Sequence, residues 1–212
     1  MRKTNIILLA SLNKGKIHEY QELFKEYPAL EFKTLPELVF NVSSMKEAEK
    51  GTTYEENAYS KGRLAHLAAK YPTLSDDSGL EVDALGGRPG VFSDRYAEPK
   101  KDETREEANV RKMLEELKGV PKEKRTARFV CTTIFFVEGV HLVASEMLEG
   151  SILEVPRGTN GFGYDPIFLV KGTDKSLAEM DLEEKNKISH RAKALHSIMK
   201  QIQEKGIKLV RP

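Results

Sequence analysis

The sequence predicts an α/β fold in which a mixed central β-sheet is flanked by helices. Two observations lead to this prediction. Segments with the apolar runs or the alternation typical of strands are interleaved with segments whose apolar residues recur at helical spacing. The 212 residues also contain no internal repeat, low-complexity tract or Pro/Gly/Ser-rich linker. We therefore expect one domain spanning residues 1–212.

The N-terminal elements are expected to be a strand, a helix and an extended segment. Residues 5–10 contain a continuous apolar run, Ile6–Ala10, as in a strand that is buried on both faces. Asn13 can cap the helix that follows. The apolar and aromatic residues at helical spacing in that helix are Ile17, Tyr20, Phe24 and Tyr27. Residues 32–40 are expected to be extended.

A second helix and two short strands are expected next. The helix covers about residues 53–70 and begins with a capping box at Thr53. Two strands, 73–76 and 80–82, are then expected on either side of a tight turn at Ser78-Gly79, because serine and glycine favour turns.

The second half of the chain is expected to contain two further helices and a long hairpin. The third helix covers about residues 103–117. Apolar and polar residues alternate along 125–137 and along 141–155, which predicts the two strands of a hairpin that turns at 138–139. A capping box at Asp181 precedes the last helix.

Composition excludes several classes of function. The chain has 34 Lys and Arg against 33 Asp and Glu, a net charge of only +1, so it lacks the basic excess expected of a nucleic-acid binder. The single cysteine, Cys131, lies in a strand-like segment and cannot form an internal disulfide. We see no signal peptide and no run long enough to span a membrane, so we expect a cytoplasmic protein.

One candidate phosphate site lies where the first strand meets the first helix. Ser11 and Asn13 offer donors there, and Lys16 adds a full positive charge one turn into the helix. The first amide groups of a helix are themselves unpaired donors in a positive potential. Taken alone, an ordinary Asn cap followed by a solvated lysine explains this pattern better.

Acidic residues indicate a candidate magnesium site. Asp76 and Asp77 are adjacent at the end of an apolar segment, and Glu49 precedes the second helix. Asn57 and Lys61 are one turn apart on that helix and share a face. Mg²⁺ prefers hard oxygen ligands, usually one or two carboxylates together with water and phosphate oxygens. The alternative is that Asp76 and Asp77 only shape a turn.

Two further motifs could contact a base or sugar. The segment 161–168, Gly-Phe-Gly-Tyr-Asp-Pro-Ile-Phe, combines glycines that allow a close approach with aromatic rings that can stack. It is neither a Walker A loop nor a dinucleotide fingerprint. Ser189 can cap the last helix and place His190 and Arg191 in its first turn, where arginine opposes the helix dipole.

Together these motifs closely resemble the inosine/xanthosine triphosphate pyrophosphatase family. The resemblance runs from Ile6 to about Leu195, with the motifs in the family's order. Asp-Asp-Ser-Gly at 76–79, the segment 161–168 and Ser-His-Arg at 189–191 are specific to it. The family typically opens with Thr-Gly-Asn, whereas this chain has Ser-Leu-Asn at 11–13.

The resemblance implies a Mg²⁺-dependent hydrolase that converts non-standard purine nucleoside triphosphates to the monophosphate and pyrophosphate. It also implies an elongated, two-lobed fold with the active-site cleft between the lobes, and a homodimer. Asp77 would be the general base. Glu49 and Asp77 would ligate Mg²⁺, with Asp76 beside them. The substrate-binding residues would be Ser11, Leu12, Asn13, Lys14, Gly15, Lys16, Lys61, Ser78, Phe162, Gly163, Tyr164, Asp165, Lys185, His190 and Arg191.

Two alternatives remain open at the level of sequence. One is a pyrophosphatase of related fold that acts on modified pyrimidine nucleotides, against which the His190-Arg191 pair argues. The other is a nucleotide-binding module without catalytic activity. The acidic set of Glu49, Asp76 and Asp77 argues against it, because a sensor does not need both a metal and a base.

Overall fold

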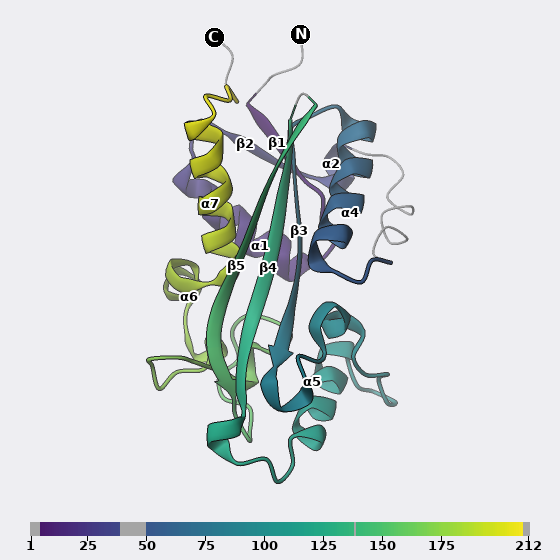
Figure 1. Ribbon diagram of the computed structural model, residues 1–212, viewed down its shortest axis with the longest axis vertical. Coiled ribbons are helices and arrows are strands. Elements are labelled where there is room, and N and C mark those ends of the chain that lie inside the picture. The colour runs from purple at the N-terminus through teal and green to yellow at the C-terminus, as the bar shows by residue number, and fades with distance from the viewer. Residues whose placement is uncertain (1–4, 39–49, 138, 210–212) are drawn as a thin grey trace. The chain divides into compact units, whose positions relative to one another are not determined.

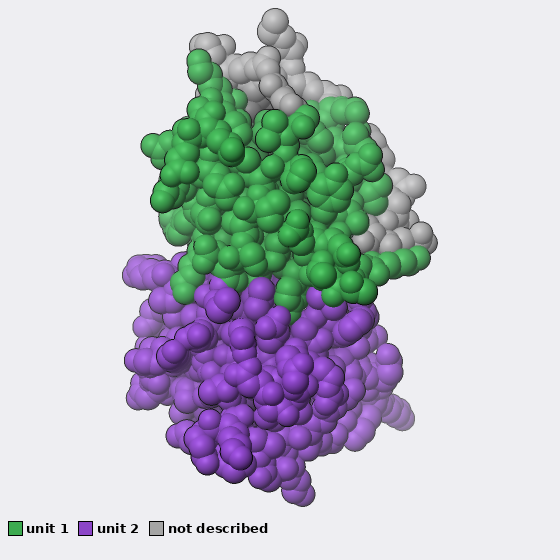
Figure 2. Space-filling model, viewed as in Figure 1, with its two compact units in different colours: residues 1–77, 131–146, 191–212 green, residues 78–130, 147–190 purple. Residues whose placement is uncertain are grey.

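The computed structural model describes residues 5–38, 50–137 and 139–209. Its residue contacts group the chain into two compact units, which Figure 2 distinguishes by colour. Unit 1 comprises residues 1–77, 131–146 and 191–212, and unit 2 comprises residues 78–130 and 147–190.

The strands form one mixed sheet in the order β2-β1-β3-β4-β5-β6. Their bounds are β1 Ile6–Leu9, β2 Glu31–Thr34, β3 Thr73–Val82, β4 Thr126–Val137, β5 Val140–Ile152 and β6 Phe168–Val170. Strand β1 pairs in parallel with both β2 and β3, whereas β6 runs antiparallel to β5. The predicted mixed sheet is therefore confirmed.

Helices flank the strands, as predicted (Figure 1). Their bounds are α1 Lys14–Leu23, α2 Leu35–Leu38, α4 Tyr54–Ala69, α5 Arg105–Glu116, α6 Leu182–Ile188 and α7 His190–Glu204. In the part of the chain that the structure describes, no helix combines the length and the apolar character that crossing a membrane requires.

The core of unit 1 follows the two-residue alternation of its strands. Ile7 and Leu9 of β1 are buried in a cluster that includes residues of α1 and α7. Their neighbours Leu8 and Ala10 are buried in another cluster, which includes Ala65 of α4. Because successive side chains of a strand point to opposite faces, β1 has α1 and α7 on one face and α4 on the other. This explains why the predicted strand is apolar without interruption.

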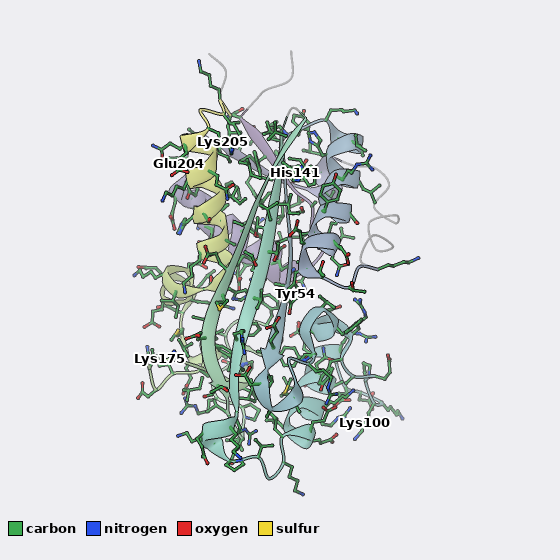
Figure 3. All side chains as sticks on the ribbon, in the orientation of Figure 1. Tyr54, Lys100, His141, Lys175, Glu204 and Lys205 are labelled. Carbon is green, nitrogen blue, oxygen red and sulfur yellow. The ribbon has the colours of Figure 1, made fainter. Side chains whose placement is uncertain are left out.

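Unit 2 has a core of its own, built between α5 and the strand segments of that unit. Met113 and Leu117 are fully buried at the C-terminal end of α5. They belong to one cluster with Leu80 of β3, Phe129 of β4 and other apolar side chains of the unit. Figure 3 shows the side chains of this unit around the labelled Lys100 and Lys175, which both lie outside that cluster.

The predicted helix starts are confirmed in atomic detail. The Asn13 side chain accepts a hydrogen bond from the backbone N–H of Lys16, which caps α1. Both halves of the capping box at Thr53 are formed, and so are both halves at Asp181. A third capping box starts α5 at Thr104, which the sequence reading did not single out.

The turn predicted at Ser78-Gly79 does not exist, because β3 runs without a break from Thr73 to Val82. Gly79 is needed for another reason. A Cβ atom at this position would lie 2.2 Å from the backbone oxygen of Gly90, so only glycine allows the two segments to approach so closely. The local turn preference of Ser and Gly is overridden by sheet pairing.

Two other boundaries differ from the prediction. The segment expected to be extended over residues 32–40 ends as a strand at Thr34 and continues as the short helix α2, while residues 39 and 40 lie outside the described residues. The capping box at Asp181 starts a separate short helix, α6, which ends at Ile188, whereas α7 begins at His190 directly after Ser189, where the sequence predicted the start of the last helix. The predicted hairpin strands are present as β4 and β5, and Glu138 of its turn lies outside the described part.

Candidate active site

The N-terminus of α1 brings the first three candidate residues together in unit 1. Asn13 caps the helix, and the backbone N–H of Asn13 donates to the Ser11 hydroxyl oxygen at 3.3 Å. Lys16 lies one turn further along and is largely buried, with only 9% of its surface exposed. A solvated lysine is therefore excluded, and the helix start carries a fixed positive charge.

Lys16 is buried because it belongs to an ion network centred on Asp76. Its Nζ lies 2.9 Å from Asp76 Oδ2, and the Nε of Arg191 lies 3.5 Å from the same oxygen. Arg191 also forms an ion pair with Glu19 on α1. Cys131 Sγ is 3.7 Å from Asp76 Oδ2. These five side chains join α1, β3, β4 and α7 of one unit.

The network holds Asp76 and Lys16 in their charged forms and Cys131 as a neutral thiol. Burial alone would raise the pKa of Asp76, but the nearby charges of Lys16, Arg191 and Lys61 hold that pKa well below its usual value. Burial likewise acts to lower the pKa of Lys16, and the carboxylates of Asp76 and Asp77 reverse that effect and raise it. Burial raises the pKa of the Cys131 thiol to about 12, which fits a packed core residue and not a nucleophile.

Asp77 has a different environment from its neighbour. Its Oδ2 accepts a hydrogen bond of 2.9 Å from the side-chain amide of Asn57 on α4. Burial raises the pKa of Asp77, and Lys16, Lys61 and the Asn57 hydrogen bond oppose this shift without cancelling it. The pKa values of the two adjacent carboxylates are thus shifted in opposite directions. Asp76 stays ionised, and Asp77 takes a proton more readily.

The oxygen atoms in this region fit a hard divalent cation such as Mg²⁺. Asp76 Oδ1 is buried and has no hydrogen-bond partner among the residues that the structure describes. Asp77 supplies a second carboxylate, and Mg²⁺ commonly binds to one or two carboxylates with water and phosphate oxygens in the remaining positions. Among the described residues, no group of three or more His, Cys, Asp and Glu side chains could enclose a metal ion. The predicted third ligand, Glu49, lies outside those residues.

A second group of candidate residues lies in unit 2, around the loop at 161–165. Asp165 Oδ2 accepts hydrogen bonds from the backbone N–H of Phe162 at 2.9 Å and from Lys185 Nζ at 2.5 Å. The Lys185 ammonium also lies 5.2 Å from the centre of the Phe162 ring. On the other side of the loop, Glu106 of α5 accepts the Gly163 N–H at 3.0 Å. The loop is therefore held in one conformation from two sides.

Tyr164 and His190 are largely buried in unit 2. The Tyr164 hydroxyl donates to the backbone oxygen of Ser93 at 2.9 Å, and its ring belongs to the core cluster of this unit. His190 is only 4% exposed, and its ring stacks on Phe129 with centroids 4.9 Å apart and planes 7° from parallel. Phe162 and Gly163 are the partly exposed members of the motif.

The predicted residues thus fall into two groups, one in each unit. The group in unit 1 contains Ser11, Leu12, Asn13, Lys14, Gly15, Lys16, Lys61, Asp76, Asp77 and Arg191, of which Lys14 is exposed and Leu12, Asn13 and Gly15 are partly buried. The group in unit 2 contains Ser78, Phe162, Gly163, Tyr164, Asp165, Lys185 and His190. Arg191 forms ion pairs with Glu19 and Asp76 within unit 1, and its contact with the sugar and base, which the resemblance implies, stays a prediction.

Sequence reasoning missed Glu19 in the first group, and it singled out Asn57 on the face of α4 that carries Lys61 without giving Asn57 a role. Glu19 is 2% exposed and pairs with Arg191, and Asn57 is 1% exposed and bonds to Asp77. For Glu19 a signal was available, because it lies three residues after Lys16 and one before Tyr20 on the buried face of α1. A lysine and a glutamate on the buried face of a helix indicate a buried ion network.

Comparisons with known proteins show the family to which this chain is similar and solved structures of the same fold. The model of the Ham1 family matches residues 7–201. A protein of Bacillus subtilis (strain 168) named dITP/XTP pyrophosphatase is 46% identical over 194 residues, which cover 91% of this chain and 94% of that protein. The solved Ham1 protein of Staphylococcus aureus superposes with a TM-score of 0.78 at 36% identity, over 94% of this chain and 99% of that one. The solved HAM1 protein of Coxiella burnetii gives a TM-score of 0.78 at 39% identity, over 94% of this chain and 98% of that one.

We expect Arg191→Ala to lower the free energy of unfolding by about 3–5 kcal/mol, because it removes the cation between the buried carboxylates of Glu19 and Asp76. Urea denaturation measures this change. The control is His196→Ala on the same helix, which removes an exposed pair with Glu26 and should cost at most about 1 kcal/mol. Equal effects of the two substitutions would contradict a stabilising role for the buried network.

Proposed function

The chain belongs to the Ham1 family, and on that premise we propose that it is a Mg²⁺-dependent pyrophosphatase of non-standard purine nucleoside triphosphates. The substrates would be inosine, deoxyinosine and xanthosine triphosphates, and the products the monophosphate and pyrophosphate. The relatives named dITP/XTP pyrophosphatase support this substrate class, since the first of them is matched over more than nine-tenths of both chains.

The proposal rests on one observation. Beside the two buried lysines, the pKa of Asp76 is lowered whereas the pKa of the adjacent Asp77 is raised. The charges of Lys16 and Lys61 act on both carboxylates. A carboxylate whose pKa is raised can take a proton, and cations held beside it can bind the phosphates of the molecule that reacts. A turn without catalytic function would need neither feature.

In the reaction that we propose, Lys16 and Lys61 bind the triphosphate together with backbone N–H groups at the start of α1. Asp77 accepts a hydrogen bond from a water molecule, orients it toward the α-phosphorus and takes its proton as the new P–O bond forms. The bond from the α-phosphorus to the bridging oxygen breaks, and pyrophosphate leaves with that oxygen. Held by Glu49 and Asp77, Mg²⁺ would supply charge neutralisation for the leaving group.

The chain's own charges support the need for a cation. Among the described residues of unit 1, the three buried cations Lys16, Lys61 and Arg191 are matched by three buried carboxylates, those of Glu19, Asp76 and Asp77. A triphosphate brings several further negative charges, which this balanced set does not neutralise. The charge balance therefore leaves the charge of the phosphates to be neutralised by an additional cation such as Mg²⁺.

Recognition of the base is proposed for the group in unit 2. The Phe162 ring can stack on a purine, and Lys185 and His190 can donate hydrogen bonds toward a 6-oxo group. Adenine presents a 6-amino donor at that position and would leave such donors unpaired, which is heavily penalised in a buried site. Asp165 and Tyr164 would hold the loop in place, and Arg191 would support Asp76.

We expect the purified protein to release pyrophosphate from inosine triphosphate in the presence of Mg²⁺ and to stop when the metal is chelated. Pyrophosphate detection with a panel of inosine, xanthosine, adenosine and modified pyrimidine triphosphates tests both statements. Adding back Mg²⁺ should restore turnover. A preference for a modified pyrimidine would overturn the purine assignment, and turnover in excess chelator would overturn the metal assignment.

Asp77→Asn should lower kcat by about 10²–10⁴-fold, because asparagine keeps the size of the side chain but cannot take the proton. Steady-state rates with inosine triphosphate measure the loss, and a thermal melt shows whether the fold survives. Asp174→Asn, at an exposed position, is the matched control and should leave kcat unchanged. A near-normal rate for Asp77→Asn would show that another group is the base.

We also propose a homodimer, on the family resemblance alone. Light scattering should then give about twice the 23.9 kDa mass of the chain. An active monomer whose mass does not change with concentration would contradict this proposal. The cytoplasmic location expected from the sequence stays a prediction.

A further inference from the structure

Asn57 lies in the first turns of α4, where its side chain is almost completely enclosed at 1% exposure. Its backbone N–H donates to Thr53 at the helix start, so the backbone of this residue is fixed by the helix itself. A buried amide must find hydrogen-bond partners at both its oxygen and its nitrogen, because an unpaired polar group costs free energy.

Both ends of the Asn57 amide are used, and by two different segments of unit 1. Asn57 Oδ1 accepts the backbone N–H of Gly51 at 2.8 Å. Asn57 Nδ2 donates to Asp77 Oδ2 at 2.9 Å. Because the first partner is a donor and the second an acceptor, only one orientation of the amide satisfies both. The loop before α4 thereby fixes which end of the amide faces β3.

The glycine at position 51 is an independent sign of this arrangement. A Cβ atom there would lie 2.9 Å from Asn57 Oδ1 and 2.6 Å from the Cβ of Glu56. Any other residue would push the loop away from the amide. Glycine at position 51 therefore allows the loop to come close enough to the Asn57 side chain to donate the hydrogen bond that orients its amide.

We infer that Asn57 is a positioning residue that orients the carboxylate of Asp77 for its role in the reaction. This inference rests on the proposed function. With Oδ2 held by the amide, the carboxylate cannot rotate freely, and Oδ1 is the oxygen left for water or metal. In the part of the chain that the structure describes, Asn57 is the one side chain that hydrogen-bonds to Asp77.

The chain contains a matched control for this inference. Asn109 is also a buried asparagine near the start of a helix, at 4% exposure. Its Oδ1 accepts the Ala97 N–H at 2.8 Å, and its Nδ2 donates to the Ser93 backbone oxygen at 3.1 Å. It therefore joins backbone segments in the same way but orients no carboxylate.

The test compares Asn57→Leu with Asn109→Leu, since leucine keeps the approximate volume and removes both hydrogen bonds. Both variants should melt at a lower temperature than the wild type. Only Asn57→Leu should also lower kcat for inosine triphosphate by about 10–100-fold and raise the Mg²⁺ concentration for half-maximal rate, as observed when a group that orients a metal ligand is lost. The KM for the nucleotide should change by less than about threefold. An Asn57→Leu protein that is less stable but has a wild-type kcat and Mg²⁺ dependence would overturn the inference.

A second measurement uses the wild-type protein and needs no folded variant. The nitrogen–proton signals of the Asn57 side-chain amide should shift when Mg²⁺ is added without nucleotide, whereas those of Asn109 should not. Unmoved Asn57 signals in a protein that hydrolyses inosine triphosphate would also overturn the inference. A wild-type protein that releases no pyrophosphate from any nucleotide would overturn the proposed function instead, and the amide signals would still report on the coupling.

Discussion

The buried carboxylate of Asp76 is the constraint on which unit 1 depends. It is fully enclosed and ionised, and an enclosed anion is tolerated only beside cations. Lys16 comes from the first helix and Arg191 from the last, so one oxygen of β3 holds both ends of the chain to the sheet. Replacing this carboxylate would leave two buried cations without their shared partner, and Glu19 could satisfy only one of them.

The charge on Asp76 also contributes to the raised pKa of the neighbouring Asp77. With Asp76 permanently charged, a second charge on Asp77 is disfavoured by repulsion in addition to burial, although Lys16 and Lys61 offset part of that cost. The side chains of adjacent strand residues point to opposite faces, so Asp76 meets α1 and α7 whereas Asp77 meets α4. The two carboxylates, separated by one peptide bond, therefore have different hydrogen-bond and ion-pair contacts, although the charges of Lys16 and Lys61 act on both.

Local signals in the sequence were enough to predict α1, α4, α5, the hairpin strands β4 and β5, and most helix starts, but not α2 or β6. Asn13, Thr53 and Asp181 cap helices because a cap depends only on residues within one turn of it. The same local reasoning failed at Ser78-Gly79, where the approach of Gly90 and the pairing of β3 outweigh turn preference. The partner of Arg191 is 172 residues away, at Glu19, and no local pattern reveals so distant a contact. The family resemblance supplied the candidate site as a set of residues, but it did not distinguish residues that are packed from residues that face outward.

The division of the chain between the units has a consequence for synthesis. Unit 1 is assembled from the first, a middle and the last segment, and its core packs Leu9 against side chains of α7 such as Leu195 and Ile198. At roughly 5–20 residues per second, about 10–40 s separate the synthesis of β1 from that of α7. For that time an apolar strand exists without the helix that covers one of its faces. A ribosome that stops before residue 191 therefore releases a chain with an exposed hydrophobic sheet face, the kind of surface that chaperones bind.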